Sequence, residues 1–495
     1  MRNEWVLLPI IIPLAGAAIA VLLRRTHRVQ AAWSFGAMLT SLAVSVLLLI
    51  DVLSTGRPVV FQVGAWPAPF GISLMGDALA ALMAVMCQVV LAAGLVYARG
   101  SRDQCVQYSG FFPLFLALAA GLTGAMLTGD LFNLFVFAEL VVISGTILTA
   151  ISDDKSGVEA AFKYFFISLL ASALLLIAIG SLYASYGTLN MADLARRIAA
   201  EPDRPLLPIA LATLTAAFLI KSAVFPFHFW QPDFHSASPT AVSAMLSSVV
   251  VKIGVYGLLR MTTLIFVEQA GPLRELLVVL GLIGVLFGGL AAIGTQHAKR
   301  MLAYSTLGQI GFMLVGIGWG TPLALMAALV FAVNHALLKS AMLMLAGNVA
   351  SRAPIKSAAF NVIGGLGKTL PLAGALFLLG GMGLAGLPPM NGFLSKYLLF
   401  NSGLSAQEFG SLALAATGSV FTLVYVARAF QKIWWEPPVE GAKAKPYGDR
   451  LIAPALLIGL CLLIGVWGEP LLKVSAAVID WISTPAAYIS AVRGG

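Results

Sequence analysis

The sequence predicts an all-α polytopic membrane protein with about 14 transmembrane helices, two of them broken. Three observations predict this fold class. Hydrophobic residues make up 60% of the 495 residues and charged residues only 10%, whereas soluble proteins carry about 25% charged residues. The apolar residues fall in long Leu-, Ala- and Gly-rich stretches that are separated by short polar connections. Two stretches contain proline near a lysine, a combination that interrupts a helix at membrane depth.

The apolar stretches are the predicted membrane-spanning helices, since a helix needs about 20 apolar residues to cross a bilayer. Strands are not needed, because a lone segment in lipid must satisfy its own backbone hydrogen bonds. In chain order the stretches are 5–23, 33–53, 74–98, 109–128, 130–151, 160–184, 207–229, 239–266, 274–294, 300–319, 321–348, 369–402, 410–432 and 451–469.

The two ends of the chain and its orientation follow from charge. The first stretch runs into Arg24 and Arg25 without a small-residue cleavage site, so we expect a retained span rather than a signal peptide. Residues 470–492 are amphipathic and are expected at the membrane interface. Odd-numbered connections carry most of the Lys and Arg residues, Lys299 included, while Arg260 is assigned to an even-numbered one. The positive-inside rule then places both termini outside. We expect the protein to lie in the cell membrane.

Several functions are excluded or disfavoured. The net charge of +9 reflects this topology and does not indicate a nucleic-acid partner. The three cysteines lack CxxC spacing, and the sequence contains no common nucleotide-binding or hydrolase motif. No histidines or carboxylates show metal-ligand spacing. We therefore expect no metal, no cofactor and no enzymatic reaction.

Charged residues inside the apolar stretches are the main functional signal. They are Lys221, Lys252, Lys339 and Lys396, and the only acid well inside a stretch is Glu139. Each lysine costs about 2.5–3.5 kcal/mol at a helix centre. The alternative is that the lysines extend to the interface or form structural pairs. Their combined cost favours a role in a wet cavity inside the bundle.

Proton handling is the chemistry that such groups favour. Burial disfavours the charged form of an amine, and a nearby carboxylate restores it. A lysine balanced between the two effects gains or loses a proton when its neighbour changes. Glu139 is the expected partner of Lys221, although the sequence alone does not establish the contact.

A histidine extends this row. His335 and Lys339 are four residues apart and share one helix face. We interpret them as a relay that links Lys252 to Lys396, because histidine exchanges protons near neutral pH. The alternative is a hydrogen-bonded packing histidine. Together Glu139, Lys221, Lys252, His335, Lys339 and Lys396 form the predicted buried row.

Prolines interrupt two of the stretches that carry these lysines. Pro226 follows Lys221, and the pair Pro388 and Pro389 precedes Lys396. Interrupted segments in the two halves of a transporter indicate inverted repeats and a binding site at the midplane. The alternative is a simple kink at each proline.

The connection after the first break carries three further candidates. His228, Asp233 and His235 lie around the sequence Phe-Trp-Gln-Pro-Asp-Phe. We predict a gate or access point for protons there, and a purely structural role is the alternative.

Six motifs together make the sequence resemble the family of proton-translocating antiporter-like subunits. This family includes the large membrane subunits of respiratory complex I and subunits of Mrp-type multisubunit cation/proton antiporters, and the wording and length here most resemble the D-type subunits of the Mrp branch. The resemblance covers roughly residues 75–430. The motifs are Gly129–Glu139, Lys221–Thr240, Val249–Tyr256, Lys299–Phe312, Asn334–Ser340 and Gly386–Lys396.

The resemblance implies a domain organisation and a set of roles. Residues 1–108 would hold helices 1–3, residues 109–266 and 267–432 two inverted five-helix repeats, and residues 433–495 the last helix with an interfacial segment. It implies that Glu139 pairs with Lys221, that Lys252 is the central lysine, and that Lys396 lies on the exit side, with His335 and Lys339 as the relay. His297-Ala298 departs from the acidic residue and leucine that the family often has at that turn, so no salt bridge is expected there.

The function implied is a proton-translocating subunit of a monovalent cation (Na⁺)/H⁺ antiporter, a secondary transporter rather than an enzyme. Its partners would be the lipid bilayer and subunits of A, B, C, E, F and G type, and its ions H⁺ with Na⁺ or another monovalent cation. The first alternative is a proton-pumping membrane subunit of a complex I-like oxidoreductase or a membrane-bound hydrogenase. The second is a scaffold subunit with a vestigial channel.

Overall fold

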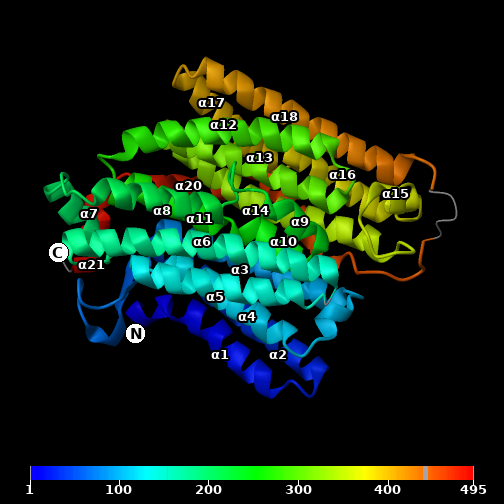
Figure 1. Ribbon diagram of the computed structural model, residues 1–495, viewed down its shortest axis with the longest axis horizontal. Coiled ribbons are helices and arrows are strands. Elements are labelled where there is room, and N and C mark those ends of the chain that lie inside the picture. The colour runs from blue at the N-terminus through cyan, green and yellow to red at the C-terminus, as the bar shows by residue number, and fades with distance from the viewer. Residues whose placement is uncertain (1, 153, 439–443, 494–495) are drawn as a thin grey trace.

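The computed structural model describes residues 2–152, 154–438 and 444–493. Most helices run along the long axis of an elongated bundle (Figure 1). The helices of the first half are α1 (Leu8–Leu22), α2 (His27–Thr55), α3 (Ala78–Gly100), α4 (Phe111–Leu127), α5 (Leu131–Ala150), α6 (Lys155–Tyr186), α7 (Met191–Ala200), α8 (Leu207–Lys221), α9 (Trp230–Ala237), α10 (Thr240–Met245) and α11 (Lys252–Arg260). Those of the second half are α12 (Ala270–Gly294), α13 (Ala298–Trp319), α14 (Pro322–Ser351), α15 (Phe360–Ile363), α16 (Pro371–Ala385), α17 (Gly392–Ser405), α18 (Phe409–Phe430), α19 (Ile452–Val466), α20 (Glu469–Ile482) and α21 (Pro485–Arg493).

Every apolar stretch of the sequence overlaps at least one of these helices. Among the described residues, nine helices are long and apolar enough to cross a membrane, or ten if the bent pair α19–α20 is one span. Four further apolar helices, α1, α4, α8 and α16, are shorter. The helices satisfy their own backbone hydrogen bonds, as lipid requires.

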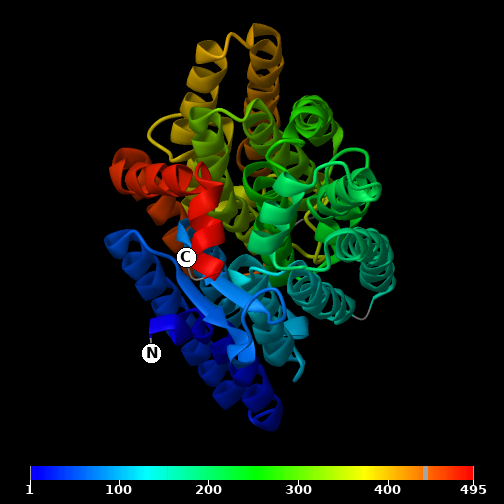
Figure 2. The same ribbon diagram turned by 90° about the vertical axis from the view of Figure 1, so that its left-hand side faces the viewer.

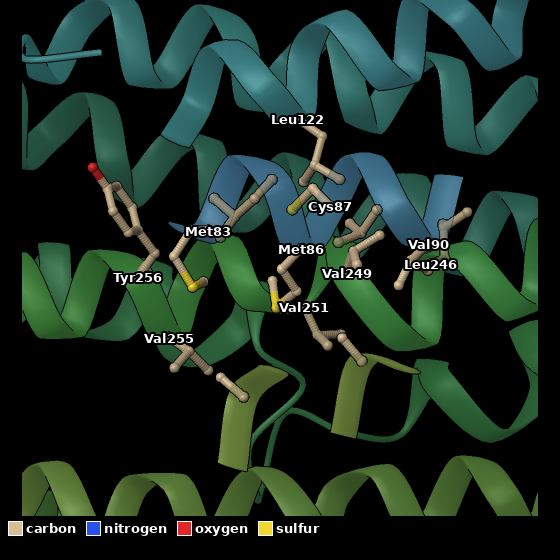
Figure 3. Close-up of a cluster of buried hydrophobic side chains, with 14 of the residues drawn as sticks. Met83, Met86, Cys87, Val90, Leu122, Leu246, Val249, Val251, Val255 and Tyr256 are labelled. Atoms are coloured by element: carbon tan, nitrogen blue, oxygen red, sulfur yellow. The ribbon is translucent and has the colours of Figure 1, made fainter. Parts of the chain in front are cut away.

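The centre of the bundle is formed by four segments. The span Thr240–Ile265, which contains α10 and α11, and helix α14 are wholly buried over their most apolar windows. Helices α3 and α13 are nearly so, whereas α2 and α18 are only 28% buried and lie at the periphery. Figure 3 shows α3 packed against α4 and the span Thr240–Ile265 through Met83, Met86, Cys87, Val90, Leu122, Leu246, Val249, Val251, Val255 and Tyr256.

Two predicted spans are interrupted as the prolines indicate. Helix α8 ends at Lys221, and the chain turns through Pro226 before α9 begins at Trp230. Helix α16 ends at Ala385, and Gly386 takes a left-handed conformation before α17 begins at Gly392. The segment that the sequence assigned to a connection after residue 229 is therefore a short helix, α9.

The expectation that the chain needs no strands is wrong at one place. Strands β1 (Val59–Gln62) and β2 (Ser73–Gly76) pair antiparallel, with Val59 opposite Gly76. They lie between α2 and α3 at the end of the bundle, where they face the viewer in Figure 2. A strand pair with open edges is compatible with this position because it lies beyond the spanning helices, where water can satisfy its edges.

The C-terminal region differs from a simple interfacial segment. Helix α19 bends by 79° into α20, and α20 packs against α14 and α3. It crosses the end of the bundle in Figure 2. The N- and C-terminal ends both lie at this end of the molecule (Figure 1).

Candidate functional site

Lys252 and His335 meet at the centre of the bundle. Lys252 begins α11, shortly after the π-helical turn Leu246–Val250, and His335 lies midway along α14. The Lys252 Nζ atom is in hydrogen-bonding contact with His335 Nδ1, and both side chains are buried. The His335 Nε2 atom has no hydrogen-bond partner among the described residues. The structure thus joins two predicted members of the buried row that lie far apart in sequence.

Lys339 is held by neutral oxygen atoms one helical turn away from His335. Its Nζ donates hydrogen bonds to Leu302 O at 3.0 Å and to Ser305 Oγ at 2.6 Å, both on α13. The Ser305 hydroxyl lies 2.6 Å from the hydroxyl of Tyr425 on α18. The ammonium group therefore has hydrogen-bond partners without a counter-charge in the part of the chain that the structure describes.

Lys396 reaches back across the second break. Its Nζ donates to Ala385 O at 2.8 Å, the carbonyl of the last residue of α16. The same nitrogen lies 5.1 Å from the centre of the Phe312 ring. The carboxyl end of a helix carries partial negative charge, so the interrupted helix itself supplies a partner for this buried amine.

A small cavity connects His335 and Lys396. It has a volume of about 10 Å³ and is lined by both side chains, by Asn334 and Ser395. A space of this size holds about one water molecule. Water could thus bridge the imidazole and the amine, which share no direct contact in the described structure.

The Glu139–Lys221 pair forms on the other side of the centre. Lys221 Nζ lies 3.6 Å from Glu139 Oε1, and the hydroxyl of Ser172 on α6 donates to the same carboxylate oxygen. Lys221 is only 7% exposed and Glu139 is 24% exposed. The contact predicted from the sequence is therefore present, with Lys221 at the end of α8 and Glu139 on α5.

No direct contact joins this pair to the central lysine in the described residues. A cavity of about 20 Å³ lies beside Lys221, and Val250 and Ile253, which flank Lys252 in the chain, line it. Its size again corresponds to about one water. The structure therefore brings Lys252, His335, Lys339 and Lys396 into one cluster and leaves a small gap before Lys221.

The three residues predicted to form a gate lie in different surroundings. His228 packs against the rings of Phe225 and Phe287, with the ring centres 5.5 Å and 4.9 Å apart. Asp233 on α9 is paired at 2.9 Å with both Lys163 of α6 and Arg300 of α13. The structure thus places His228 in an aromatic cluster and uses Asp233 to connect three helices.

His235 is fully buried on α9. Its Nδ1 atom lies 3.3 Å from Ser243 Oγ. Ser236 and Ala237, which follow it on α9, line a cavity at one end of the bundle.

That end contains a polar vestibule, which is a cavity of about 470 Å³. Ser238 and Thr240, at the junction of α9 and α10, line it. Lys299 lines it as well and donates to Ser238 O at 3.3 Å. The assignment of Lys299 to a connection is wrong, since this residue lies in α13 and its side chain is buried. Its position next to Arg300, at the start of a predicted span, made it look like a residue of the connection.

His297 begins the same helix. Its Nδ1 atom accepts a hydrogen bond from Arg300 N at 3.3 Å and so caps α13. Burial and the charges of Lys299 and Arg300 lower the pKa of His297 to about 4. The ring is therefore neutral at pH 7 and can accept at Nδ1. A cap thus replaces the acidic residue that the family resemblance would place at this turn.

A buried ion pair that no sequence pattern indicates joins α11 to the start of α3. Arg260 donates to both carboxylate oxygens of Asp77 at 2.7 Å, and both side chains are buried. The indole of Trp481 on α20 donates to Asp77 Oδ2 at 2.9 Å. The assignment of Arg260 to a connection is wrong, because a π-helical turn, Met261–Ile265, extends the span beyond it.

Two asparagines also support the site without a signal in the sequence. Asn334 Nδ2 donates to Asn391 O at 2.8 Å, and Asn391 Nδ2 donates to Asn334 Oδ1 at 3.0 Å. These hydrogen bonds hold the break between α16 and α17 against α14, beside His335. Among the described residues, no three His, Cys, Asp or Glu side chains are placed to hold a metal ion.

These features define a class of protein: a multi-pass membrane protein whose core holds a row of titratable side chains and small cavities. Residues 128–422 match the family described as "NADH:quinone oxidoreductase/Mrp antiporter, TM". The chain belongs to this family.

Individual relatives agree with this assignment. The chain is 32% identical to the D subunit of the Na⁺/H⁺ antiporter of Alkalihalophilus pseudofirmus, over 99% of both chains. It is 35% identical to the N subunit of the NADH-quinone oxidoreductase of Desulforudis audaxviator, over 94% of this chain and 97% of the relative. The structure resembles a chain of the Mrp complex from Dietzia sp. DQ12-45-1b with a TM-score of 0.90 and 28% identity, over 100% of this chain and 99% of that one.

Proposed function

We propose that the chain is the proton-translocating subunit of a multisubunit monovalent cation (Na⁺)/H⁺ antiporter in the cell membrane. The observation that carries this proposal is the contact between Lys252 and His335 in the buried centre. The likeness to the D subunit of an Na⁺/H⁺ antiporter over 99% of both chains supports it. The chain acts as a secondary transport subunit and catalyses no covalent reaction.

The proton path runs along the buried row and through water. With Lys252 protonated, its Nζ donates to His335 Nδ1, so the ring proton lies on Nε2. Nε2 has no partner among the described residues, and the ring lines the cavity shared with Lys396. A proton taken up at Nδ1 therefore allows release from Nε2 towards Lys396, which is how imidazole transfers protons between two sides.

The vestibule supplies access to this row. His235 is buried on α9 directly before the vestibule residues Ser236 and Ala237, which supports a role for His235 as the access point. Glu139 and Lys221 act at the other end, where a change in their charge alters the protonation of Lys252 through the intervening cavity. We assign His228 and Asp233 to positioning the break and α9.

The proposed topology has 14 spans. Residues 109–266 and 267–432 form two inverted five-helix repeats that follow helices 1–3 in residues 1–108, and the last helix lies in residues 433–495. The end of the bundle with the vestibule faces the cytoplasm, and both termini face outside, as the charge of the connections favours. The partners are the subunits of A, B, C, E, F and G type.

A second candidate is a proton-pumping membrane subunit of a redox-driven complex. The 35% identity to the N subunit of an NADH-quinone oxidoreductase favours it. In that complex the same row would be driven by electron transfer in partner subunits. The subunits that co-purify with the chain distinguish the two: small antiporter subunits support the first proposal, and quinone-reductase or hydrogenase subunits overturn it.

Lys252→Arg tests the proton path in the purified complex. Arginine keeps the positive charge but does not release its proton near neutral pH. Proton flux in vesicles should fall by about tenfold or more, as far as in Lys252→Ala. Normal flux in Lys252→Arg would reduce Lys252 to a fixed charge and overturn the path. Lys473→Ala, at an exposed position, should leave the flux unchanged.

A further inference from the structure

A groove of about 360 Å³ lies at the end of the bundle that carries the termini. Its walls come from the end of α2 and from α20. Val52 and Leu53 contribute apolar surface from the first, and Ala477 and Trp481 from the second. The volume falls within the range of small-molecule sites. None of the residues of the buried row lines the groove.

Two opposite charges line the same groove. Arg57 follows the last turn of α2, and Asp480 lies near the end of α20. Both residues are exposed. No ion-pair partner is found for either side chain within the described parts of the chain. An apolar groove that presents a cation and an anion in this way matches an amphipathic ligand that carries both a negative and a positive group.

The position of the groove selects the ligand. Arg57 lies directly beyond the helix α2, which is apolar enough to cross the membrane, so it is at the depth where lipid headgroups meet water. A guanidinium binds phosphate oxygens in a bidentate manner. A carboxylate accepts hydrogen bonds, and a primary ammonium group offers three N–H donors. A quaternary ammonium group offers no such donor.

We propose that this groove binds one zwitterionic phospholipid whose headgroup carries a primary ammonium group, as in phosphatidylethanolamine. Arg57 binds the phosphate, Asp480 accepts from the ammonium group, and an acyl chain lies against Val52, Leu53 and Ala477.

The bound lipid also contacts the network behind the groove. Trp481 lines the groove and donates to Asp77, which holds Arg260 at the end of α11. The other end of α11 is Lys252. The lipid therefore packs against Trp481, whose hydrogen-bond partner Asp77 holds the end of α11.

Native mass spectrometry of the purified complex tests the proposal. The complex is first placed in vesicles of phosphatidylethanolamine and phosphatidylglycerol, then extracted in mild detergent. The wild-type chain should retain one phosphatidylethanolamine. Arg57→Ala and Asp480→Ala should each reduce the retained fraction by about tenfold, because each removes one charge-assisted contact. Lys473→Ala is the matched control, since Lys473 is an exposed cation on α20 that does not line the groove.

Two further comparisons locate the site and its headgroup specificity. Ala477→Trp fills the groove at an exposed position and keeps both charges, so it should also lose the lipid. Vesicles of phosphatidylcholine should lower retention in the wild type but have no added effect in Asp480→Ala. Equal retention of both lipids by the wild type, retention by Ala477→Trp, or another subunit instead of lipid on this face would overturn the proposal. The readout does not depend on transport, so it stands or fails separately from the proposed function.

Discussion

Lys221 and Glu139 form an ion pair across α8 and α5, with Nζ 3.6 Å from Oε1. No other polar partner is found for Lys221 Nζ among the described residues. Ser172 also donates to Glu139. The carboxylate is therefore the one group in this part of the chain that balances the buried amine, and the two side chains should act as a unit.

The pair gives a prediction of non-additivity. Glu139→Gln and Lys221→Met should each reduce proton flux by about tenfold or more. The double variant should be no slower than the slower single variant, because groups that act as one unit do not lose their effect twice. Proton flux in vesicles that contain the complete complex measures this.

The exposed pair Glu469 and Lys473 is the control. It has the same chemistry and a distance of 2.7 Å, but both side chains face solvent. Glu469→Gln with Lys473→Met should leave flux unchanged. If the fold-loss of proton flux in the double variant equals the product of the two single fold-losses, Glu139 and Lys221 act independently.

The buried pair of Asp77 and Arg260 predicts a stability effect. Asp77→Asn keeps the cap on α3, where Asp77 Oδ1 accepts from Ala80 N at 2.8 Å, because asparagine is an equally good cap. It leaves Arg260 charged and unpaired, which should lower stability by about 3–5 kcal/mol. Arg260→Met should have a similar effect. Combining the two removes both charges and should recover much of the loss, as measured by the thermal unfolding midpoint.

A full recovery requires that the ion pair be the main role of both residues. The unfolding midpoint of the double variant could instead fall by the sum of the decreases in the two single variants. In that case the contacts of Arg260 with Tyr256 and Tyr488 contribute more than the pair itself.

This pair also shows what sequence reasoning could and could not obtain. Hydropathy located the spans because lipid demands long apolar helices, and it exposed the buried lysines because charge is rare there. Arg260 was not recognised as a buried residue, because a charged residue near the end of an apolar stretch is usually taken to mark the end of the membrane span. Its partner, Asp77, lies 183 residues away. Contacts between distant helices depend on packing, which a single sequence does not encode in any local pattern.

The same limit applies to α9 and to the vestibule. The composition of Trp230–Ala237 is polar enough to read as a loop, yet its backbone is helical and His235 is buried. The burial of each lysine in the row could be predicted separately, from the apolar sequence around it. The contact of Lys252 with His335 was not, since the distance between them depends on how α11 meets α14.

Asp130 and Asp193 predict opposite responses to pH. Burial raises the pKa of Asp130 to about 6, although backbone N–H groups of α5 oppose the shift. A raised pKa means that Asp130 favours the folded state below about pH 4 and that this contribution is lost as the pH rises through 6. Asp130→Asn keeps the cap on Asn133 and removes the buried charge. At pH 7 it should stabilise the protein by about 1–3 kcal/mol, and at pH 4 the gain should vanish.

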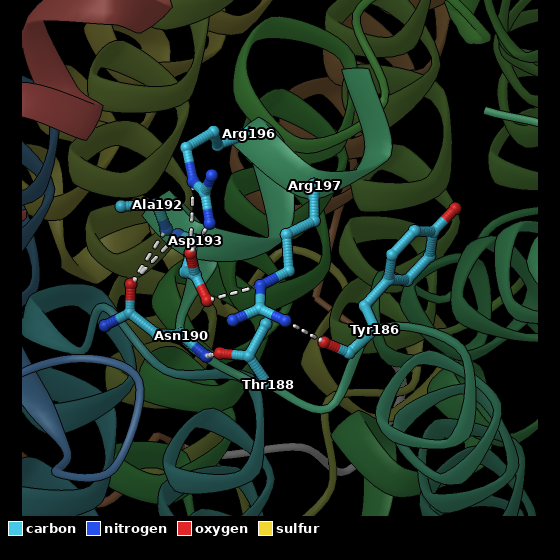
Figure 4. Close-up of polar contacts among 7 residues, drawn as sticks. All are labelled: Tyr186, Thr188, Asn190, Ala192, Asp193, Arg196 and Arg197. Carbon is cyan, nitrogen blue, oxygen red and sulfur yellow. Dashed lines mark hydrogen bonds and ion pairs between the residues drawn. The ribbon is translucent and has the colours of Figure 1, made fainter. Parts of the chain in front are cut away.

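Asp193 on α7 is the matched control. It is paired with Arg196 and Arg197 at 2.9 Å and 2.8 Å, and Asn190 caps the same helix (Figure 4). Burial alone would raise the pKa of Asp193, but the two arginines lower it below the usual value. Its contribution is therefore present above about pH 4 and is lost as the pH falls through the lowered pKa. Asp193→Asn should thus lower the melting temperature at pH 7, and a gain there would contradict the ion pairs.

The position of the vestibule predicts the side of the membrane from which its residues can be labelled. Ser357 lines the vestibule, while Ser483, directly after α20, is exposed at the opposite end of the bundle and does not line the groove there. Cys105 also lines the vestibule and must first be replaced by serine. In that background Ser357→Cys should react with a membrane-impermeant cationic thiol reagent only from the cytoplasmic side, and proton flux should fall by about tenfold because a fixed charge now occupies the access cavity. Ser483→Cys should react only from outside and leave flux unchanged. Reaction of Ser357→Cys from outside would reverse the proposed topology, and reaction from the cytoplasm without loss of flux would mean that protons reach His235 by another route.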